Sequence, residues 1–231
     1  MTKLSLASCP SFQELPADLV DGPLRAAATV CIELQKSAAA DLVRSAYTPD
    51  RSGGEPVSKE ALDHILASNA DVRGIATERD ITNAIPFNIR SVERTVKDRQ
   101  VIAARKHLDD LVSRRMAELF ERRERPLLFK SGQYWYPHGG YMGWHTNNRY
   151  PGWRLYVSYA AEPEKSFFRY RRPDGGEIVT SLDTGWNVRL FEVNPARPLW
   201  HAVWSETDRF SFGYVVRPWS LRHAVAHRLG L

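Results

Sequence analysis

The aromatic residues are distributed unevenly along this chain, and this distribution is the strongest constraint on its fold. All seven tryptophans lie after residue 126, in a stretch that is also rich in tyrosine, phenylalanine, valine and glycine. Before residue 126, alanine, leucine and charged residues dominate. Aromatic and β-branched residues favour strands, whereas alanine, leucine and the long charged residues favour helices. We therefore predict a mainly helical N-terminal part, residues 1–126, followed by a β-rich part, residues 127–218.

Three segments of the N-terminal part have helical character. Residues 24–46 are rich in good helix formers and contain no glycine or proline, and Ser58 precedes a short apolar segment. Residues 91–125 form the longest pattern, which Pro126 ends. Its apolar residues recur at helical spacing between charges: Val101, Ala104, Leu108, Leu111, Val112 and Leu119. We predict three helices, with a loop at residues 50–56 between the first two.

The C-terminal part contains short aromatic or β-branched segments separated by turn residues such as glycine, proline and asparagine. We predict strands at residues 134–136, 153–159, 166–170, 177–180, 187–193, 200–204 and 210–216. So many short strands in succession predict an antiparallel sheet that is closed or sandwiched. A last short helix is predicted at residues 221–229, within the C-terminal segment 219–231.

Composition bears on where the protein works and on its partners. Cys9 and Cys31 form no CxxC pair, the first residues lack the apolar stretch of a secretion signal, and no segment approaches the roughly 20 apolar residues of a membrane span. We expect a reduced, soluble, cytoplasmic protein. The formal net charge is +5, but basic and acidic residues alternate through residues 90–125, which is typical of a solvated helix face. We therefore do not expect nucleic acid as a partner, and a modest basic excess equally suits an anionic co-substrate.

Two of the seven histidines have a setting that suits a metal site. His145 and His201 lie in or beside predicted strands of the aromatic part, and each follows a tryptophan. Imidazoles from separate strands of one sheet can bind iron, zinc or copper. The alternative is a pair of core histidines. Four of the remaining five histidines lie in segments that we predict to be solvated helices, His138 being the exception: His64, His107, His223 and His227.

Arg209 follows His201 after a short predicted turn, and Arg209 and Ser211 would lie on the same face of the next strand. A guanidinium inside a β-sandwich requires an anionic partner, because a lone buried charge is costly. A carboxylate is such a partner, since arginine can bind it with two parallel hydrogen bonds. The alternative is a surface ion pair between Arg209 and Asp208 or Glu206.

Taken in order, three groups of residues resemble a known family: His145-Thr146-Asn147, then His201, then Arg209-Phe210-Ser211. They are similar to the iron(II)/2-oxoglutarate-dependent oxygenases, and the string GWHTNNRYPGWRLYVSYA resembles uncharacterised bacterial and phage members. The resemblance covers roughly residues 129–217. It implies an α+β protein with a double-stranded β-helix, which is a jelly-roll or cupin-like barrel, against which the N-terminal helices pack.

The resemblance also implies roles and an activity. His145 and His201 would be iron ligands, Arg209 would bind the distal carboxylate of 2-oxoglutarate, and Ser211 would donate a hydrogen bond to it. The implied reactants are Fe(II), 2-oxoglutarate and O2. The implied enzyme is a dioxygenase that hydroxylates an unactivated C–H bond of a small-molecule substrate, anionic or neutral, and releases succinate and CO2.

Asn147 departs from the family pattern, in which a carboxylate is the third iron ligand. An asparagine can coordinate through its amide oxygen, more weakly, or leave that position to water or halide. A halogenase is therefore an alternative, although the family's halogenases have a smaller residue here. His138 could instead complete the site. A non-catalytic β-domain that binds a sugar, another ligand or nucleic acid is a further alternative.

Other residues are candidates for the walls of the site. Arg154 and Tyr156 either touch the co-substrate or pack within the barrel. The candidates for the substrate pocket are Tyr134, Tyr136, His138, Trp144, Asn148, Arg149 and Trp186. The N-terminal helices either buttress the barrel or form the contact of a homodimer.

Overall fold

The computed structural model describes residues 3–68, 81–87, 96–121, 124–148 and 150–220. The helix predicted at residues 221–229 lies outside the described residues. Eight of the strands are β4 (Leu127–Tyr136), β5 (Gly140–His145), β6 (Gly152–Ala160), β7 (Ser166–Arg171), β8 (Ile178–Leu182), β9 (Trp186–Val193), β10 (His201–Ser205) and β11 (Arg209–Arg217).

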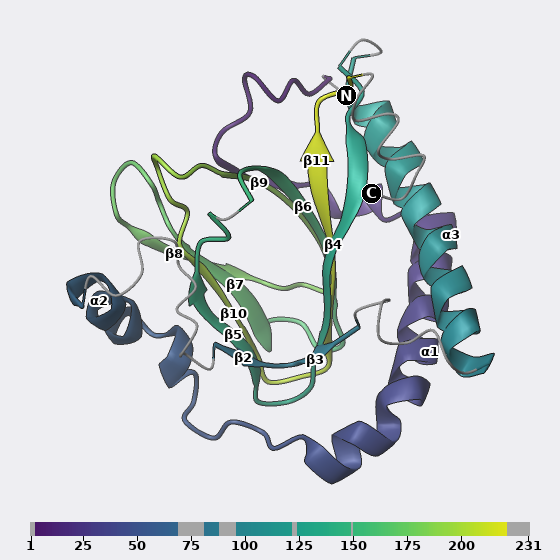
Figure 1. Cartoon of the computed structure of the whole chain (residues 1–231), viewed down its shortest axis with the longest axis horizontal. Helices are drawn as coiled ribbons and strands as arrows, with labels where there is room; N and C mark the ends of the chain where they lie inside the picture. Colours follow the sequence, from purple (N-terminus) through teal and green to yellow (C-terminus); the bar gives the residue numbers. More distant parts are fainter. Residues whose placement is uncertain (1–2, 69–80, 88–95, 122–123, 149, 221–231) are drawn as a thin grey trace.

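These strands form two antiparallel sheets that face each other (Figure 1). Three short strands complete the sheets at their edges: β1 (Phe12–Leu15), β2 (Thr82–Asn83) and β3 (Ile85–Pro86). The major sheet has the strand order β1-β9-β6-β11-β4-β3, and the minor sheet has the order β2-β5-β10-β7-β8. Most strands that are neighbours in space are not consecutive in the chain, as in a jelly roll, and β7 and β8 form an exception as a hairpin. The predicted double-stranded β-helix is confirmed. Among the described residues the two sheets share no strand, so the fold is a sandwich rather than a closed barrel.

All seven predicted strands form, and the structure adds four that we did not predict. β5 was missed because its two glycines weaken the strand pattern, and it forms by pairing with β10. The other three lie in the N-terminal part: β1 (Phe12–Leu15), β2 (Thr82–Asn83) and β3 (Ile85–Pro86). They lengthen the two sheets at their edges, so this part is not only helical. Strands of two to four residues carry too little periodicity to be recognised.

Three helices form in the predicted segments: α1 (Gly22–Ala46), α2 (Lys59–Ala67) and α3 (Val96–Leu119). The side chain of Asp21 caps α1 by accepting a hydrogen bond from the Leu24 N–H, and Ser58 caps α2 by accepting one from the Ala61 N–H. The loop at residues 50–56 runs into a short 3-10 helix, η2 (Glu55–Val57), and a second one, η1 (Ala17–Leu19), precedes α1. Among the described helices, none is long and apolar enough to cross a membrane.

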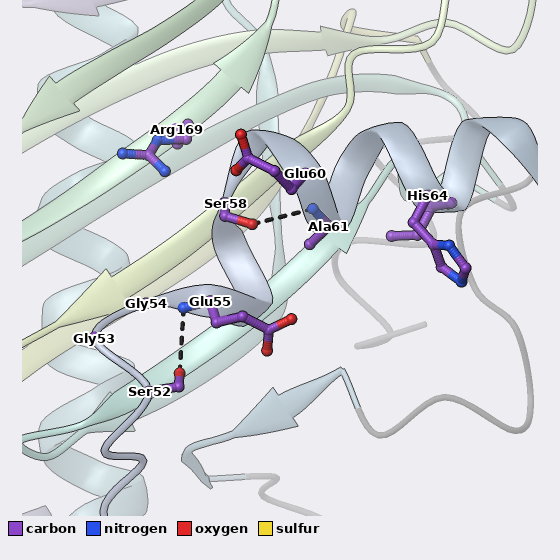
Figure 2. A pocket seen from close by; sticks show the side chains of 10 residues that line it. Ser52, Gly53, Gly54, Glu55, Ser58, Glu60, Ala61, His64 and Arg169 are labelled. Atoms are coloured by element: carbon purple, nitrogen blue, oxygen red, sulfur yellow. Dashed lines mark hydrogen bonds between the residues drawn. The ribbon is translucent and has the colours of Figure 1, made fainter.

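α2 and η2 cover the outer face of the minor sheet. Apolar side chains from both layers pack there: Val57, Leu62, Trp144, Trp200, Ala202 and Trp204. A groove of about 660 Å³ opens beside them, between the N-terminal turn of α2 and Arg169 of β7 (Figure 2). This groove lies outside the sandwich.

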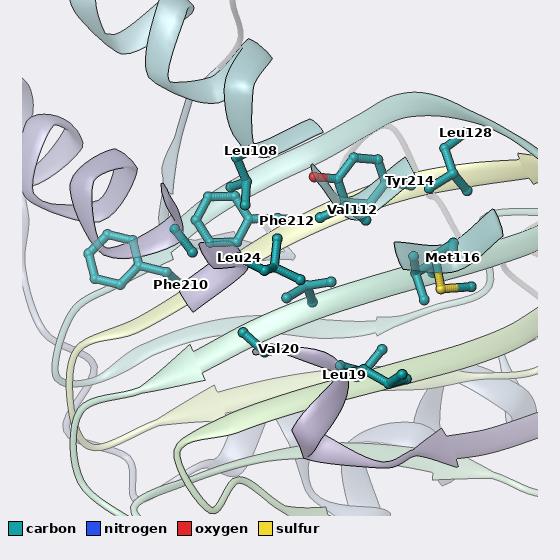
Figure 3. Close-up of a cluster of buried hydrophobic side chains, with 14 of the residues drawn as sticks. Leu19, Val20, Leu24, Leu108, Val112, Met116, Leu128, Phe210, Phe212 and Tyr214 are labelled. Carbon is teal, nitrogen blue, oxygen red and sulfur yellow. The ribbon is translucent and has the colours of Figure 1, made fainter. Parts of the chain in front are cut away.

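α1 and α3 lie against the outer face of the major sheet and form the largest apolar core (Figures 1 and 3). Leu24 of α1, together with Leu108 and Val112 of α3, packs onto Phe212 and Tyr214 of β11. The apolar positions predicted from helical spacing in α3 are buried or partly buried, and all except Val101 belong to or pack against the core that α3 shares with α1 and the sheet. The helices therefore buttress the major sheet from outside, and its inner face carries the aromatic and polar side chains that face the minor sheet.

Candidate metal centre

His145 and His201 meet between the two sheets. His145 ends β5 and His201 begins β10, and these two residues are direct cross-strand partners. Their ring centroids lie 4.1 Å apart, and their exposed fractions are 4% and 0%. Two imidazoles at this separation can share one metal ion.

The alternation of side chains along the strands explains why these rings point inward. Trp144 and Trp200, the residues before the two histidines, pack on the outer face of the minor sheet. Neighbouring residues of a strand point to opposite faces, so the histidines must face the interior. The indole N–H of Trp144 donates to the Ser58 carbonyl, 2.7 Å away, which anchors this end of β5 under α2.

Backbone carbonyls set the tautomer of both rings. The Nδ1 atom of His145 lies 2.8 Å from the Gly143 carbonyl oxygen, and that of His201 lies 3.0 Å from the Leu199 carbonyl oxygen. A carbonyl can only accept, so in each ring Nδ1 carries the proton and Nε2 presents its lone pair. This is the arrangement in which a histidine ligates a metal through Nε2 while its other nitrogen is held by the protein.

The charge state of His201 also suits a ligand. Burial lowers the pKa of His201 well below its ordinary value, and the neighbouring His145 lowers this pKa further. The ring is therefore neutral at physiological pH, as metal coordination requires. Phe168 and Phe191 pack against the ring, with centroid distances of 5.4 Å and 5.1 Å, and exclude water from it.

Asn147 lies at the position where the resemblance implies a third ligand. Its Nδ2 atom is 3.1 Å from the Nε2 atom of His201, and its side chain also bonds with Tyr156. The backbone of Asn147 has φ of 57°, in the left-handed region that asparagine and aspartate adopt more readily than most residues. Rotation of the amide would turn its oxygen toward the same point. Among the described residues, no histidine, cysteine, aspartate or glutamate joins the two histidines in a group of three potential ligands.

Tyr156 of β6 adds a hydroxyl beside Asn147. Burial raises the pKa of Tyr156 to about 12, although Arg154 and Arg209 both lower it. The phenol is therefore protonated at neutral pH and can donate a hydrogen bond to an oxygen of a bound molecule.

Arg209 lies between the sheets, but its guanidinium is already engaged. Its Nε atom donates to Asp183, 2.8 Å away, and Asp183 also accepts from Arg189 at 2.7 Å and from Ser166 at 2.6 Å. The Nη1 atom of Arg209 is buried and has no hydrogen-bond partner among the described residues. The alternative of a surface pair with Asp208 or Glu206 is wrong, because Arg209 is buried and Asp208 pairs instead with Lys36.

This cluster, Arg189–Asp183–Arg209, has more positive than negative charge. Two buried arginines face one buried carboxylate. Burial alone would raise the pKa of Asp183, but Arg209 and Arg189 hold it well below its ordinary value. Glu14 lies 3.7 Å from the Nε atom of Arg189, yet its side chain is half-exposed and screens that charge only in part. The cluster can therefore accept one further anionic group.

Several of the other candidates also face the interior. Tyr136 lies under the guanidinium of Arg209, 5.3 Å from ring centroid to Cζ, and Tyr134 lies beside Tyr136. Ser211 shares the inner face of β11 with Arg209. Asn148 is buried, and its Oδ1 atom has no partner in the described part of the chain. Arg149 lies outside the described residues.

Three candidates do not join the site. His138 is exposed in the turn between β4 and β5, at the opposite end of β5 from His145, so it neither completes the site nor lines a pocket around the histidines. Trp144 faces α2, and Trp186 packs with Tyr159 on the helix side of the major sheet. In both tryptophans the strand alternation directs the side chain outward.

Asp183 and Arg189 were not predicted from the sequence. Arg189 lies between Val188 and Leu190, which both face the helices, so alternation in β9 directs it inward, and this signal was readable. Asp183 follows β8 in a polar turn, where an aspartate is ordinary. Its burial follows only from the packing of three strands around it.

No family model matches the sequence. No curated protein matches it either. The chain is similar to the structure of a prolyl-4-hydroxylase from Pseudomonas putida, with 14% identity, a TM-score of 0.41, and coverage of 93% of this chain and 96% of that chain.

Two further solved structures are similar at the same level. An oxidoreductase of the 2OG-Fe(II) oxygenase family from Burkholderia pseudomallei has 14% identity and a TM-score of 0.41, with coverage of 85% of this chain and 91% of that chain. A prolyl hydroxylase from Trichoplax adhaerens, in complex with a peptide fragment of hypoxia inducible factor, has 14% identity and a TM-score of 0.40, with coverage of 87% and 95%.

Proposed function

We propose that the protein is an Fe(II)- and 2-oxoglutarate-dependent dioxygenase that hydroxylates a C–H bond of a small molecule. The observation that carries this proposal is the meeting of His145 and His201 between the sheets, with each Nδ1 atom held by a backbone carbonyl. Buried imidazoles that only pack would also satisfy their N–H groups, so the feature that points to a metal is that two such rings meet with their centroids 4.1 Å apart.

The donor set fits iron. Two neutral imidazoles are nitrogen ligands of the kind that Fe(II) accepts, and the Asn147 amide oxygen is a weaker third donor in place of a carboxylate. The aromatic surroundings of His201 limit access of bulk water. Bound iron would supply the activation of dioxygen for C–H oxidation, coupled to decarboxylation of the 2-oxo acid.

The chain's other residues would bind and orient the co-substrate. Arg209 has a buried Nη1 donor to offer to the distal carboxylate, and the excess positive charge of the Arg189–Asp183–Arg209 cluster favours an anion there. The Tyr156 phenol is protonated and would donate to an oxygen of the same molecule or of the substrate. Asp183 would hold the Arg209 guanidinium in one orientation before the co-substrate arrives.

Anaerobic titration tests the proposal. Fe(II) and 2-oxoglutarate added to the metal-free protein should produce the weak visible metal-to-ligand charge-transfer band of a chelated 2-oxo acid. His145→Ala and His201→Ala should abolish metal binding, whereas His107→Ala, on the exposed face of α3, should leave it unchanged. Arg209→Gln should retain the metal and weaken 2-oxoglutarate binding. Metal binding that survives His201→Ala would contradict the proposal.

The Asn147 side chain favours hydroxylation over halogenation as the reaction of this site. Its amide already reaches His201, so it fills the place that a halide ligand would need. We therefore expect chloride to leave 2-oxoglutarate affinity unchanged, and Asn147→Asp to tighten Fe(II) binding, because a carboxylate adds a charged ligand. Tighter 2-oxoglutarate binding in chloride would favour a halogenase instead.

A further inference from the structure

Arg154 is a third buried arginine of the interior, in addition to Arg189 and Arg209, and it has no carboxylate partner among the described residues. Its exposed fraction is 3%, and among the described residues it forms no ion pair. Its two described hydrogen bonds go to the backbone carbonyls of Trp153, at 3.2 Å, and Tyr150. Carbonyls satisfy N–H donors but leave the positive charge uncompensated. Burial lowers the pKa of Arg154, which is the direction expected for a cation without a counter-charge.

This cation lies beside the histidine pair. Arg154 is the cross-strand partner of Phe191, and the Phe191 ring packs on His201 with a centroid distance of 5.1 Å. The charge of Arg154 is close enough to lower the pKa of His201. Arg154 therefore faces the same interior space as the two proposed ligands, on the opposite sheet.

Arg217, the last residue of β11, adds a second positive charge at this end of the sandwich. It donates to the Pro151 carbonyl, 2.9 Å away, and its charge lowers the pKa of Arg154. In the described part of the chain Arg217 also forms no ion pair with a carboxylate. Arg217 is only partly buried, so solvent screens part of the repulsion between the two like charges, and an anion bound beside them would relieve the rest.

The position of Arg154 is distinct from that of Arg209. On β6, Arg154 and Ala160 both face the interior, and Ala160 is the cross-strand partner of Arg209. Their separation along the strand corresponds to about 20 Å at the rise of a β-strand. Each end of the interior therefore has its own cationic group, with the histidines on the Arg154 side.

We propose that Arg154, assisted by Arg217, binds an anionic group of the substrate, a carboxylate or a phosphate monoester. This inference rests on the proposed function, in which Arg209 serves the co-substrate and leaves Arg154 for the molecule to be oxidised. The substrate would then present its reactive C–H bond to the metal at a fixed distance from its anionic group.

The test measures anion binding and co-substrate binding separately. Methyl phosphate and acetate are titrated calorimetrically into the anaerobic Fe(II)–2-oxoglutarate complex and into the metal-free protein. Arg154→Gln should weaken binding of the preferred anion at least about tenfold, which is the loss of a charge-assisted contact, and change 2-oxoglutarate affinity by less than about twofold. Arg209→Gln should show the reverse. The preference between the two probes identifies the substrate as a phosphate ester or a carboxylate.

Matched variants control for folding and location. Arg154→Lys keeps the charge and should retain part of the anion binding. Arg169→Gln removes an arginine from the groove of Figure 2, on the outer face of the minor sheet, and should have no effect. The melting temperatures of all variants are also measured, because a purely structural role of Arg154, in which it only holds the loop at Tyr150, would lower the melting temperature of Arg154→Gln without changing its anion affinity.

Four results would overturn the inference. These are no anion binding by the wild type, loss of 2-oxoglutarate rather than of the anion in Arg154→Gln, a lowered melting temperature with unchanged anion affinity, or loss of the anion in Arg169→Gln. Failure of the proposed function gives a different result, because the charge-transfer band would then be missing. Anion binding to the metal-free protein, compared between wild type and Arg154→Gln, would still test the role of Arg154.

Discussion

The carboxylate of Asp183 is enclosed by Arg189, Arg209 and Ser166 and has no access to solvent. Each arginine depends on it, because each is buried and finds in Asp183 its only fully buried counter-charge among the described residues. At the scale of single residues, the Asp183 carboxylate is therefore needed to stabilise the buried guanidinium of Arg209, which would bind the co-substrate.

Asp183→Asn should therefore destabilise the fold by about 3–5 kcal/mol at neutral pH, the cost of leaving a buried charge without its partner. The pKa of Asp183 is lowered in the folded state, so its contribution is fully present above the unfolded-state pKa of about 3.9 and is lost as pH falls below it. The difference in unfolding free energy between wild type and variant should thus shrink below about pH 4. Urea denaturation across this range measures it. A difference that does not depend on pH would show that the ionised carboxylate is not the stabilising group.

At the scale of elements, α1 and α3 attach to the major sheet through apolar side chains. Leu108 of α3 is fully buried in this interface, whereas Leu42 of α1 is 52% exposed. The major sheet holds Arg154, Tyr156 and Arg209 on its other face, so this interface supports the site from behind. Packing of the helices and geometry of the site are linked through one sheet.

Leu108→Ala should lower the free energy of unfolding by about 2–5 kcal/mol, because it removes apolar contacts and leaves a cavity between α3 and the sheet. Leu42→Ala is the matched control, since the same change on the exposed face of α1 should cost no more than about 0.5 kcal/mol. Both values come from urea denaturation followed by circular dichroism. Equal effects of the two changes would contradict the packing described for α3.

At the scale of the whole molecule, a metal ion on His145 and His201 would join the ends of β5 and β10 and, through Asn147, the loop that leads to β6 of the major sheet. A ligand that binds only the folded state stabilises it by mass action. Metal binding should therefore be visible as a change in global stability.

Co(II), which resists oxidation in air, should raise the melting temperature of the metal-free protein. At a 100-fold excess over the dissociation constant the stabilisation is about 2.7 kcal/mol, and a chain of this size gains about 2–4 °C per kcal/mol. His201→Ala should show no such rise, and His107→Ala should match the wild type. A thermal scan with and without Co(II) measures the effect, and an equal rise in His201→Ala would place the metal elsewhere.

The sequence by itself determined the two kinds of structure and most of the strands. These are local properties: residue type sets helix or strand preference, and alternation requires Trp144 and His145 to point to opposite faces. Alternation alone does not say which of these two faces is the interior one. The same alternation placed Arg209 and Ser211 on one face.

Only the tertiary structure decided which residues meet. Asp183, Arg189 and Arg209 come from three separate segments, and no local pattern states that one carboxylate lies between two guanidiniums. The outward positions of Trp144 and Trp186 and the exposure of His138 likewise depend on which layer covers each face. Which buried charges pair depends on which strands are neighbours in space, and the order of the strands follows from the packing of the whole chain.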